Sequence, residues 1–224
     1  FLSEVRQDIQ TCVNVFESDP HIRFGERVPV RRFDYTPNDT RFNQQWYLPI
    51  IQAPEAWDLW DIDGGENPGD PSIVVGVIDS GCDWDHPDLR ENLWQNMDED
   101  ADGDGSTIEQ IGNTWQLDQD DINGVDDDNN GYIDDLIGWD TADNDNNPVG
   151  PPGQGQGGGN MHGTHVAGLV SSVTNNNLGI ASTAWSVKHM AVKVQEDDND
   201  GGGFYISDAM EGIQYAAVSG AHII

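Results

Sequence analysis

The sequence Met161-His-Gly-Thr-His-Val-Ala-Gly168 follows a glycine-rich run and opens a segment with helical apolar spacing. Upstream, Ile73-Val-Val-Gly-Val-Ile-Asp79-Ser-Gly81 is a continuous apolar run that ends on an aspartate. Such a run is typical of a strand buried on both faces of a parallel sheet, and catalytic groups gather where the strands of α/β sheets end. Asp79 followed by His162 supplies two of the three groups of a hydrolytic triad.

The other apolar segments predict that strands and helices alternate along the chain. Residues 163–173 are predicted to be a helix and residues 187–194 a second buried strand. Residues 221–224 resemble the start of a third strand. This alternation predicts an α/β fold with three layers, in which a mostly parallel sheet carries helices on both faces. A further helix that stops near Gly220 is predicted from the apolar spacing of Ile206, Ala209, Met210, Ile213 and Ala217.

The composition is strongly acidic, with 9 Lys+Arg against 41 Asp+Glu and a formal net charge of −32. This charge argues against nucleic acid or an anionic membrane as a partner. No apolar run approaches the roughly 20 residues that span a bilayer. Between Arg90 and Lys188 the sequence contains neither Lys nor Arg. Composition leaves two interpretations of this acidic stretch open, a solvated surface or a binding site for cations.

A hydrolytic serine needs a base to remove its proton, and that base needs a carboxylate to fix its tautomer. Each of the two motifs is weak evidence alone. Together, V-I-D-S-G at Asp79 and H-G-T-H-V-A-G at His162 resemble the subtilisin-like serine proteases (peptidase family S8), whose triad runs Asp, His, Ser along the chain. The resemblance is strongest to the thermitase branch, through Tyr35-Thr-Pro-Asn-Asp39, Ile51-Gln-Ala-Pro54, His86-Pro-Asp88-Leu89 and Thr174-Asn-Asn176.

The resemblance implies a serine endopeptidase in which Asp79 is the triad carboxylate and His162 the general base. It implies that His165 packs structurally. The family's serine motif and oxyanion asparagine have no counterpart in residues 1–224. We therefore expect both beyond Ile224, and we expect this fragment to be inactive by itself. Two alternatives stay open: a catalytically inactive relative, and a calcium-binding interaction module.

A polypeptide is the implied substrate, and the segment Gly201, Gly202 and Gly203 resembles the loop whose backbone pairs with an extended peptide. A plain polar turn is the alternative. Residues 1–34 resemble the tail of an inhibitory propeptide, and residues 35–224 resemble the N-terminal part of the peptidase domain. Residues 1–34 carry five of the nine basic residues, which favours electrostatic docking on an acidic partner; an ordinary small subdomain is the alternative.

Calcium prefers six to eight oxygen ligands from carboxylates, amides and carbonyls, and the sequence offers this mixture in several places. Resemblance to the thermitase branch implies one site in the loop before His162 and a second that staples the N-terminal segment to the core. An acidic insertion at about 95–148, with little periodicity, suggests a third. Chance polar loops are the alternative for the second site, and a solvated acidic run is the alternative for the insertion. The predicted ligands are Asp140, Asp143, Asp145 and Asn147 in the first site, Asp39, Asp88 and Asn176 in the second, and Asp126, Asp128, Asn130 and Asp134 in the third.

Within the insertion, Asp98-x-Asp100-x-Asp102-Gly103-x5-Glu109 also satisfies the EF-hand loop pattern. Flanking helices are not predicted there, and Gly112-Asn113 would break the second helix. Because extracellular calcium is millimolar, calcium sites of this kind favour a secreted protein.

Overall fold

The computed structural model describes residues 11, 14–15, 18–21, 35–150, 160–197 and 204–224. The chain divides into two compact units, Phe1–Asp34 and Tyr35–Ile224. The predicted boundary lies at the same place. In the first unit, helical positions 11, 14 and 15 are followed by a turn at 18–21, where Asp19-Pro20 interrupts the helical pattern. All the elements below belong to the second unit.

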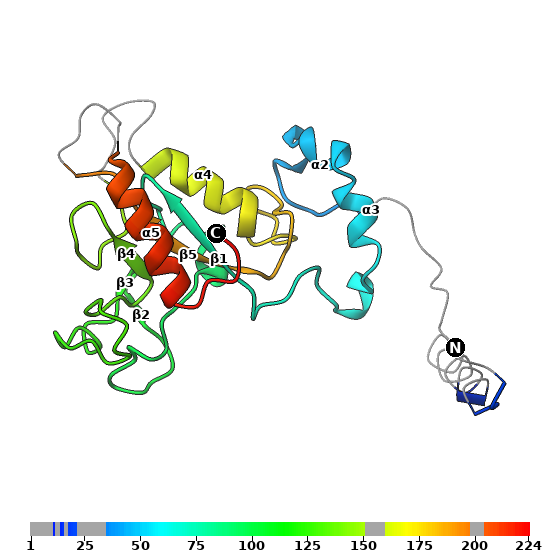
Figure 1. The fold of residues 1–224 in the computed structure, drawn as a ribbon. Coiled ribbons are helices and arrows are strands. Elements are labelled where there is room, and N and C mark those ends of the chain that lie inside the picture. Colours follow the sequence, from blue (N-terminus) through cyan, green and yellow to red (C-terminus); the bar gives the residue numbers. More distant parts are fainter. Residues whose placement is uncertain (1–10, 12–13, 16–17, 22–34, 151–159, 198–203) are drawn as a thin grey trace. The chain divides into compact units, whose positions relative to one another are not determined.

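The core of the second unit is a parallel sheet with the strand order β1–β5–β4 (Figure 1). β1 (Val74–Asp79) pairs with β5 (Lys188–Lys193), which pairs in turn with β4 (Gly138–Asp140). The register aligns Asp79 with Lys193 and Lys193 with Asp140. Three ionisable residues are therefore the last residues of three neighbouring parallel strands, and they lie together at the C-terminal end of the sheet. The two predicted buried strands are confirmed.

The predicted third strand begins beside β1. Ile223 forms a parallel bridge with Val75, and the backbone N–H of Gly76 donates to the carbonyl of Ile223 at 2.8 Å. The backbone N–H of His222 donates to the carbonyl of Val74 at 2.8 Å. Residues 222–223 therefore continue the sheet on the edge of β1 that β5 leaves open.

Helices cover both faces of this sheet. Successive strand residues point to opposite sides, so alternate residues pack against different helices. Val77 packs with Ala167 of α4 (Asn160–Ser171). Val74 and Met190 pack with Tyr215 of α5 (Ile206–Val218), on the other face. The predicted α/β class, with a mostly parallel sheet between helices, is confirmed (Figure 1).

Helix α5 is present as predicted, but its apolar stripe does not face the sheet. Ile206, Met210 and Ile213 are 74, 66 and 49% exposed. The buried side is formed by Gly212, Tyr215 and Ala216. A Cβ on Gly212 would lie 3.0 Å from the side chain of Val192, so the small residue allows the close approach. α5 is apolar on two sides, and periodicity alone does not identify the side that packs.

The acidic insertion contains more regular structure than its periodicity predicts. β2 (Ile108–Ile111) and β3 (Thr114–Leu117) form an antiparallel hairpin around Gly112-Asn113, where Gly112 has φ of +65°. Leu136 and Ile137 are fully buried in a cluster with residues from both sides of the hairpin. These two apolar residues therefore anchor the insertion to the core.

The segment after Tyr35 packs through a separate aromatic cluster around Leu48, Trp57 and Trp185. Gln45 supports it by exchanging two hydrogen bonds with the backbone of Ala181, at 2.7 and 2.8 Å. No helix in the described part of the chain has the length and apolar character to cross a membrane. The other elements are α2 (Tyr47–Ile50), α3 (Ala53–Trp57) and the 3-10 helices η1 (Phe42–Gln44), η2 (Ile62–Gly64) and η3 (Arg90–Asn92).

Candidate active site

Asp79 ends β1 at the carboxyl edge of the sheet, and its neighbour fixes the carboxylate. The backbone N–H of Ser80 donates to Oδ1 of Asp79 at 2.7 Å, and the Ser80 hydroxyl donates to the same oxygen at 3.1 Å. The Asp79 side chain is 15% exposed. Gly81 follows with φ of +108°, a conformation that favours glycine, and a Cβ there would lie 2.4 Å from the backbone nitrogen of Gly150. The D-S-G sequence therefore both holds the carboxylate and turns the chain away.

His162 lies in the first turn of α4 and reaches this carboxylate. Its Nδ1 lies 2.8 Å from Oδ1 and 2.9 Å from Oδ2 of Asp79. Because an ionised carboxylate can only accept, Nδ1 of the neutral ring carries the proton and Nε2 is the basic nitrogen. The His162 side chain is 78% exposed. The two residues that the sequence singles out are therefore in contact, with the basic nitrogen on an accessible ring.

The residues after His162 explain how the helix approaches β1 so closely. A Cβ on Gly163 would lie 2.2 Å from the carbonyl oxygen of Gly81, so only glycine fits. The N–H of Gly163 donates to the Ser80 hydroxyl at 3.4 Å, and the N–H of Asp83 donates to the Thr164 hydroxyl at 2.9 Å. The H-G-T sequence is thus shaped to the loop that follows Asp79.

Two predictions near this pair have different outcomes. His165 was predicted to pack structurally. This prediction is wrong, because His165 is exposed and lines a pocket with His86 and Arg41. Helical spacing turns this ring away from the buried side of α4. The segment Gly201, Gly202 and Gly203 lies outside the described residues.

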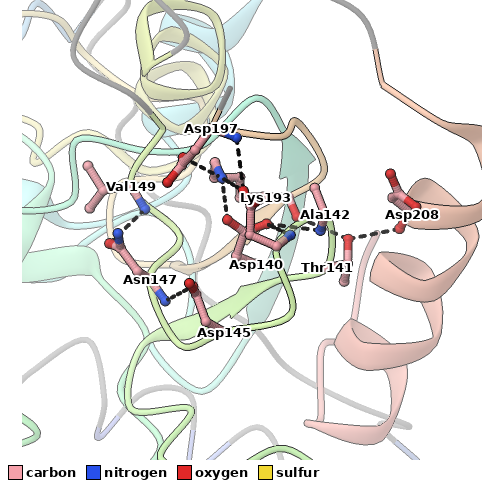
Figure 2. Close-up of polar contacts among 10 residues, drawn as sticks. Asp140, Thr141, Ala142, Asp145, Asn147, Val149, Lys193, Asp197 and Asp208 are labelled. Atoms are coloured by element: carbon pink, nitrogen blue, oxygen red, sulfur yellow. Dashed lines mark hydrogen bonds and ion pairs between the residues drawn. The ribbon is translucent and has the colours of Figure 1, made fainter. Parts of the chain in front are cut away.

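The predicted loop site before His162 contains an ammonium group, that of Lys193, which was not predicted from the sequence (Figure 2). Nζ of fully buried Lys193 contacts the carboxylates of Asp140, Asp143 and Asp197, the last two at 2.9 Å. Burial would lower the pKa of Lys193, but the hydrogen bonds that its ammonium donates to these carboxylates outweigh this effect and hold the pKa above its usual value. Lys193 therefore stays charged and neutralises part of the predicted ligand set.

The other two predicted ligands of this loop stabilise its turns. Oδ1 of Asp145 accepts the N–H of Asn147 at 2.9 Å, and the side chain of Asn147 accepts the N–H of Val149 at 3.4 Å (Figure 2). Backbone hydrogen bonds between Asp140 and Asp145 close the loop. Asp145 is not among the carboxylates that meet at Lys193. The four residues lie in one loop, but their side chains do not converge on one point.

The second predicted site is assembled from distant segments. Oδ1 of Asp88 accepts the Asn176 amide at 2.8 Å, and Oδ2 accepts the N–H of Ile180 at 3.0 Å. Oδ2 of Asp39 accepts the N–H of Asn175 at 2.8 Å, and burial, with a contribution from the charge of Asp88, raises the pKa of Asp39. Oδ1 of Asp39 is buried without a partner among the described residues. Three predicted ligands therefore meet around an oxygen that a cation would satisfy.

The third predicted site is only partly assembled. The carboxylate of Asp126 accepts the N–H groups of Asn130 and Gly131 at 3.0 and 2.9 Å. Asp134 faces elsewhere: it has φ of +53° and accepts the N–H groups of Asn123 and Gly124. Asp128 lies instead with Glu99 and Asp135, two residues that were not predicted as ligands. Asp135 follows directly on a predicted ligand, but no sequence pattern marks Glu99 as buried.

The EF-hand pattern does not form an EF-hand. Glu109, its last ligand position, lies in β2 and accepts the Gln116 amide at 2.9 Å. The carboxylate near Asp100 and Asp102 is that of Asp121 instead. An EF-hand needs a helix after its loop, and the insertion places a hairpin there.

A family model and individual relatives both relate this chain to one family of proteases. The model of the family described as the subtilase family matches residues 70–224. Thermitase of Thermoactinomyces vulgaris is 33% identical over 191 residues, which cover 85% of this chain and 47% of the relative. A thermophilic serine proteinase of Bacillus sp. (strain AK1) is 29% identical over 97% of this chain and 39% of its own length. A halolysin-like extracellular serine protease of Natrialba magadii is 28% identical over 94% of this chain and 29% of its own.

The chain thus spans about half of thermitase and smaller shares of the other two relatives. The matched family region contains both Asp79 and His162, the strands β1, β5 and β4, and the two helices that cover them. The family match covers well over half of the chain and agrees with the fold. The chain belongs to the subtilase family.

Proposed function

We propose that this protein is a calcium-stabilised serine endopeptidase in which Asp79 and His162 belong to an Asp-His-Ser triad. The observation that carries the proposal is the contact of His162 Nδ1 with both oxygens of Asp79, at 2.8 and 2.9 Å. Two of the relatives are named as serine proteases, which supports the same reaction class. The serine is proposed to follow Ile224 in the complete protein.

The proposed reaction uses the two nitrogens of His162 for different tasks. Asp79 holds Nδ1–H, so Nε2 accepts the serine proton while the serine oxygen attacks the scissile carbonyl carbon. The imidazolium that results is stabilised by the Asp79 carboxylate. Nε2–H then donates its proton to the amine that leaves, and an acyl-enzyme remains. Water, deprotonated by the same Nε2, hydrolyses the ester and restores the serine hydroxyl.

The proposed substrate is an extended polypeptide. The segment Gly201–Gly203 is proposed to pair with its backbone as an added strand, a mode that recognises main-chain groups. This segment connects β5 to α5, two elements that pack against each other. Main-chain recognition would leave the choice of side chains to other parts of the protein.

Calcium is proposed at the site of Asp39, Asp88 and Asn176. The buried, unpartnered Oδ1 of Asp39 supports this fit, as does the all-oxygen donor set. Gly179 is also adapted to the site, because a Cβ there would lie 1.9 Å from the Asp88 carboxylate. When bound, calcium would supply charge neutralisation and tie the segment after Tyr35 to the loop at 175–180. The loop of Asp140 to Asn147 fits a cation less well, because Lys193 already neutralises two of its carboxylates.

Residues 1–34 are proposed to be the tail of an inhibitory propeptide. The division of the chain after Asp34 supports this, as does the composition of the two units: the first holds five of the nine basic residues, and the second is acidic. Secretion is proposed by analogy with the relative named as extracellular. N-terminal sequencing of the matured protein tests the boundary: a start near Tyr35 is expected, and retention of residues 1–34 in active enzyme would contradict it.

Labelling with a fluorophosphonate tests the peptidase proposal, since this reagent modifies serines whose proton a nearby base removes. The complete protein should become labelled on one serine located after residue 224. His162→Ala should not be labelled, whereas the matched variant His165→Ala should. Equal labelling of His162→Ala, or no labelling of the wild-type protein, would overturn the assignment.

A further inference from the structure

The loop before His162 resembles a calcium site, yet a side chain of the protein already fills the point where carboxylates meet. One oxygen from each of Asp140, Asp143 and Asp197 lies within 4.8 Å of the others, a spacing that suits a metal ion. The ammonium group of Lys193 contacts all three carboxylates. Figure 2 shows it between Asp140 and Asp197. Because an ammonium has three donors and no acceptor, the three carboxylates satisfy it completely.

The residues of this loop do not fit calcium. The Lys193 side chain is fully buried, and three neighbouring carboxylates favour its charged form, so a positive charge lies where the ion would lie. A second cation beside it would be repelled. Calcium also takes six to eight oxygen ligands, whereas Asp145, another predicted ligand, accepts the N–H of Asn147 and lies outside the cluster at Lys193.

The far end of this loop packs against the turn that follows Asp79. The carbonyl of Pro148 accepts the N–H of Cys82 at 2.9 Å. Gly150 lies so close to Gly81 that a Cβ on Gly81 would be 2.4 Å from the backbone nitrogen of Gly150. In a close-packed interior, a shift of one partner moves the other. A displacement of the loop would therefore displace the turn that carries the triad carboxylate.

The backbone of Lys193 holds the start of the same loop beside Asp79. In the sheet register Lys193 pairs with Asp79, and the N–H of Val194 donates to the Asp79 carbonyl at 2.9 Å. The carbonyl of Lys193 accepts both the N–H and the hydroxyl of Thr141, at 2.9 and 3.0 Å. Lys193 therefore joins the loop to β5 next to the strand end that carries Asp79.

We propose that Lys193 is a positioning residue for Asp79, and that its ammonium does in this loop what a bound metal ion would do. The inference rests on the proposed function, because it concerns the placement of the triad carboxylate. Lys193 acts through the carboxylates of the loop and not on the reacting atoms. A chelator does not remove an ammonium group, so the geometry of the Asp79–His162 pair is independent of calcium, even though calcium bound elsewhere stabilises the chain.

Proton NMR of the complete protein, below its melting temperature, tests the position of Asp79 directly. The Nδ1–H of His162, which donates to a carboxylate, should give a resonance far downfield of the amide protons. Lys193→Met should shift or remove this resonance. It should also lower kcat about 10–100-fold with KM near the wild type, since a misplacement of about 1 Å can cost about 100-fold. A merely stabilising residue would change the melting temperature and leave the resonance and kcat unchanged.

Two milder variants keep the test decisive if Lys193→Met does not fold. Asp143→Asn removes a carboxylate that contacts the ammonium and is 31% exposed, and it should shift the resonance. Asp145→Asn removes the same charge from the same loop without contact to Lys193, and the resonance should stay in place.

A native resonance in folded Lys193→Met, or in Asp143→Asn if the former is unfolded, would overturn the proposal. So would a resonance that EDTA removes from the folded wild type and calcium restores, or one that Asp145→Asn loses, because a metal ion would then hold the loop. A wild-type protein that keeps the resonance but hydrolyses no peptide would contradict the proposed function alone.

Discussion

Nδ1 of His162 lies within hydrogen-bonding distance of both carboxylate oxygens of Asp79, although 83 residues separate them in the sequence. The contact forms because β1 ends at Asp79 and α4 begins beside it, with Gly163 against the carbonyl of Gly81. A strand end and a helix start are rigid supports, so the geometry of the pair does not depend on a loop.

Gly163→Ala should destabilise the chain by about 1–3 kcal/mol, the usual cost of overpacking. Its new Cβ would overlap a backbone carbonyl at 2.2 Å, which no side-chain rotation relieves. Gly168→Ala is the matched control, since its Cβ would meet only the end of the Ile180 side chain at 3.3 Å. Urea unfolding should show Gly168→Ala close to the wild type. Equal effects of the two substitutions would contradict the close packing of α4 on the active-site loop.

Lys193→Met should cost about 3–5 kcal/mol, because it leaves the buried carboxylate of Asp140 without its cationic partner. Lys188→Met is the control, since that amine donates only to the backbone carbonyl of Glu91 among the described contacts. The free energies of unfolding of Lys193→Met and Lys188→Met, each measured against the wild type, test this prediction. A loss below about 1 kcal/mol for Lys193→Met, a surface-pair magnitude, would mean that the pair is not buried in solution.

Removal of calcium should lower the melting temperature of the chain. A ligand at 100 times its dissociation constant stabilises the folded state by about 2.7 kcal/mol, which corresponds to roughly 5–10 °C for a domain of this size. Asp39→Asn should lose the share of this stabilisation that the site of Asp39, Asp88 and Asn176 provides, so its melting temperature should respond less to added calcium than that of the wild type. Melts of wild-type protein that are identical in EDTA and in millimolar calcium would refute the calcium sites.

Protonation of His189 should destabilise the folded state in acid. Burial, reinforced by the charge of Lys188, lowers the pKa of this fully buried imidazole to about 4. Between the ordinary value of 6.5 and this value, the unfolded chain binds a proton that the folded chain excludes. Stability is therefore present above pH 6.5 and is lost as the pH falls towards 4, by about 3 kcal/mol in total at 1.36 kcal/mol per pKa unit.

His189→Gln isolates this contribution from those of the many carboxylates. The amide can keep a hydrogen bond to Ser171, whose hydroxyl lies 2.8 Å from Nδ1 of His189. Free energies of unfolding at pH 4, 5 and 7 should fall less steeply with acid in His189→Gln than in the wild type. Parallel pH profiles of the two proteins would show that His189 is not held neutral.

Sequence patterns predicted the elements whose apolar residues are continuous or periodic. The runs around Val77 and Ala191 identify β1 and β5, and the D-S-G and H-G-T motifs place a carboxylate and an imidazole at strand and helix ends. Periodicity did not predict which side of α5 is buried, because that depends on the sheet that packs against it. It also missed the β2–β3 hairpin, whose short strands carry few apolar residues.

The ionic sites were less predictable, because their partners come from distant segments. Asp140 and Lys193 are 53 residues apart in the sequence. No local pattern therefore indicates that an ammonium group lies among the carboxylates of this loop, which resembles a calcium site. Glu99 stands between two predicted ligand positions and looks like a solvated residue, yet it is fully buried. Ligand spacing indicates that a loop can bind a cation, whereas burial decides which carboxylates need one.

The kinetics of peptide hydrolysis by the complete protein test the Asp79–His162 pair most directly. Asp79→Asn leaves the shape of the site intact but disturbs the tautomer of His162, so kcat/KM should fall about 10³–10⁴-fold, mostly in kcat. His162→Ala should fall at least as far, and His165→Ala should stay near the wild type. A value of kcat/KM for Asp79→Asn within tenfold of the wild type would contradict the assignment of the pair as carboxylate and general base.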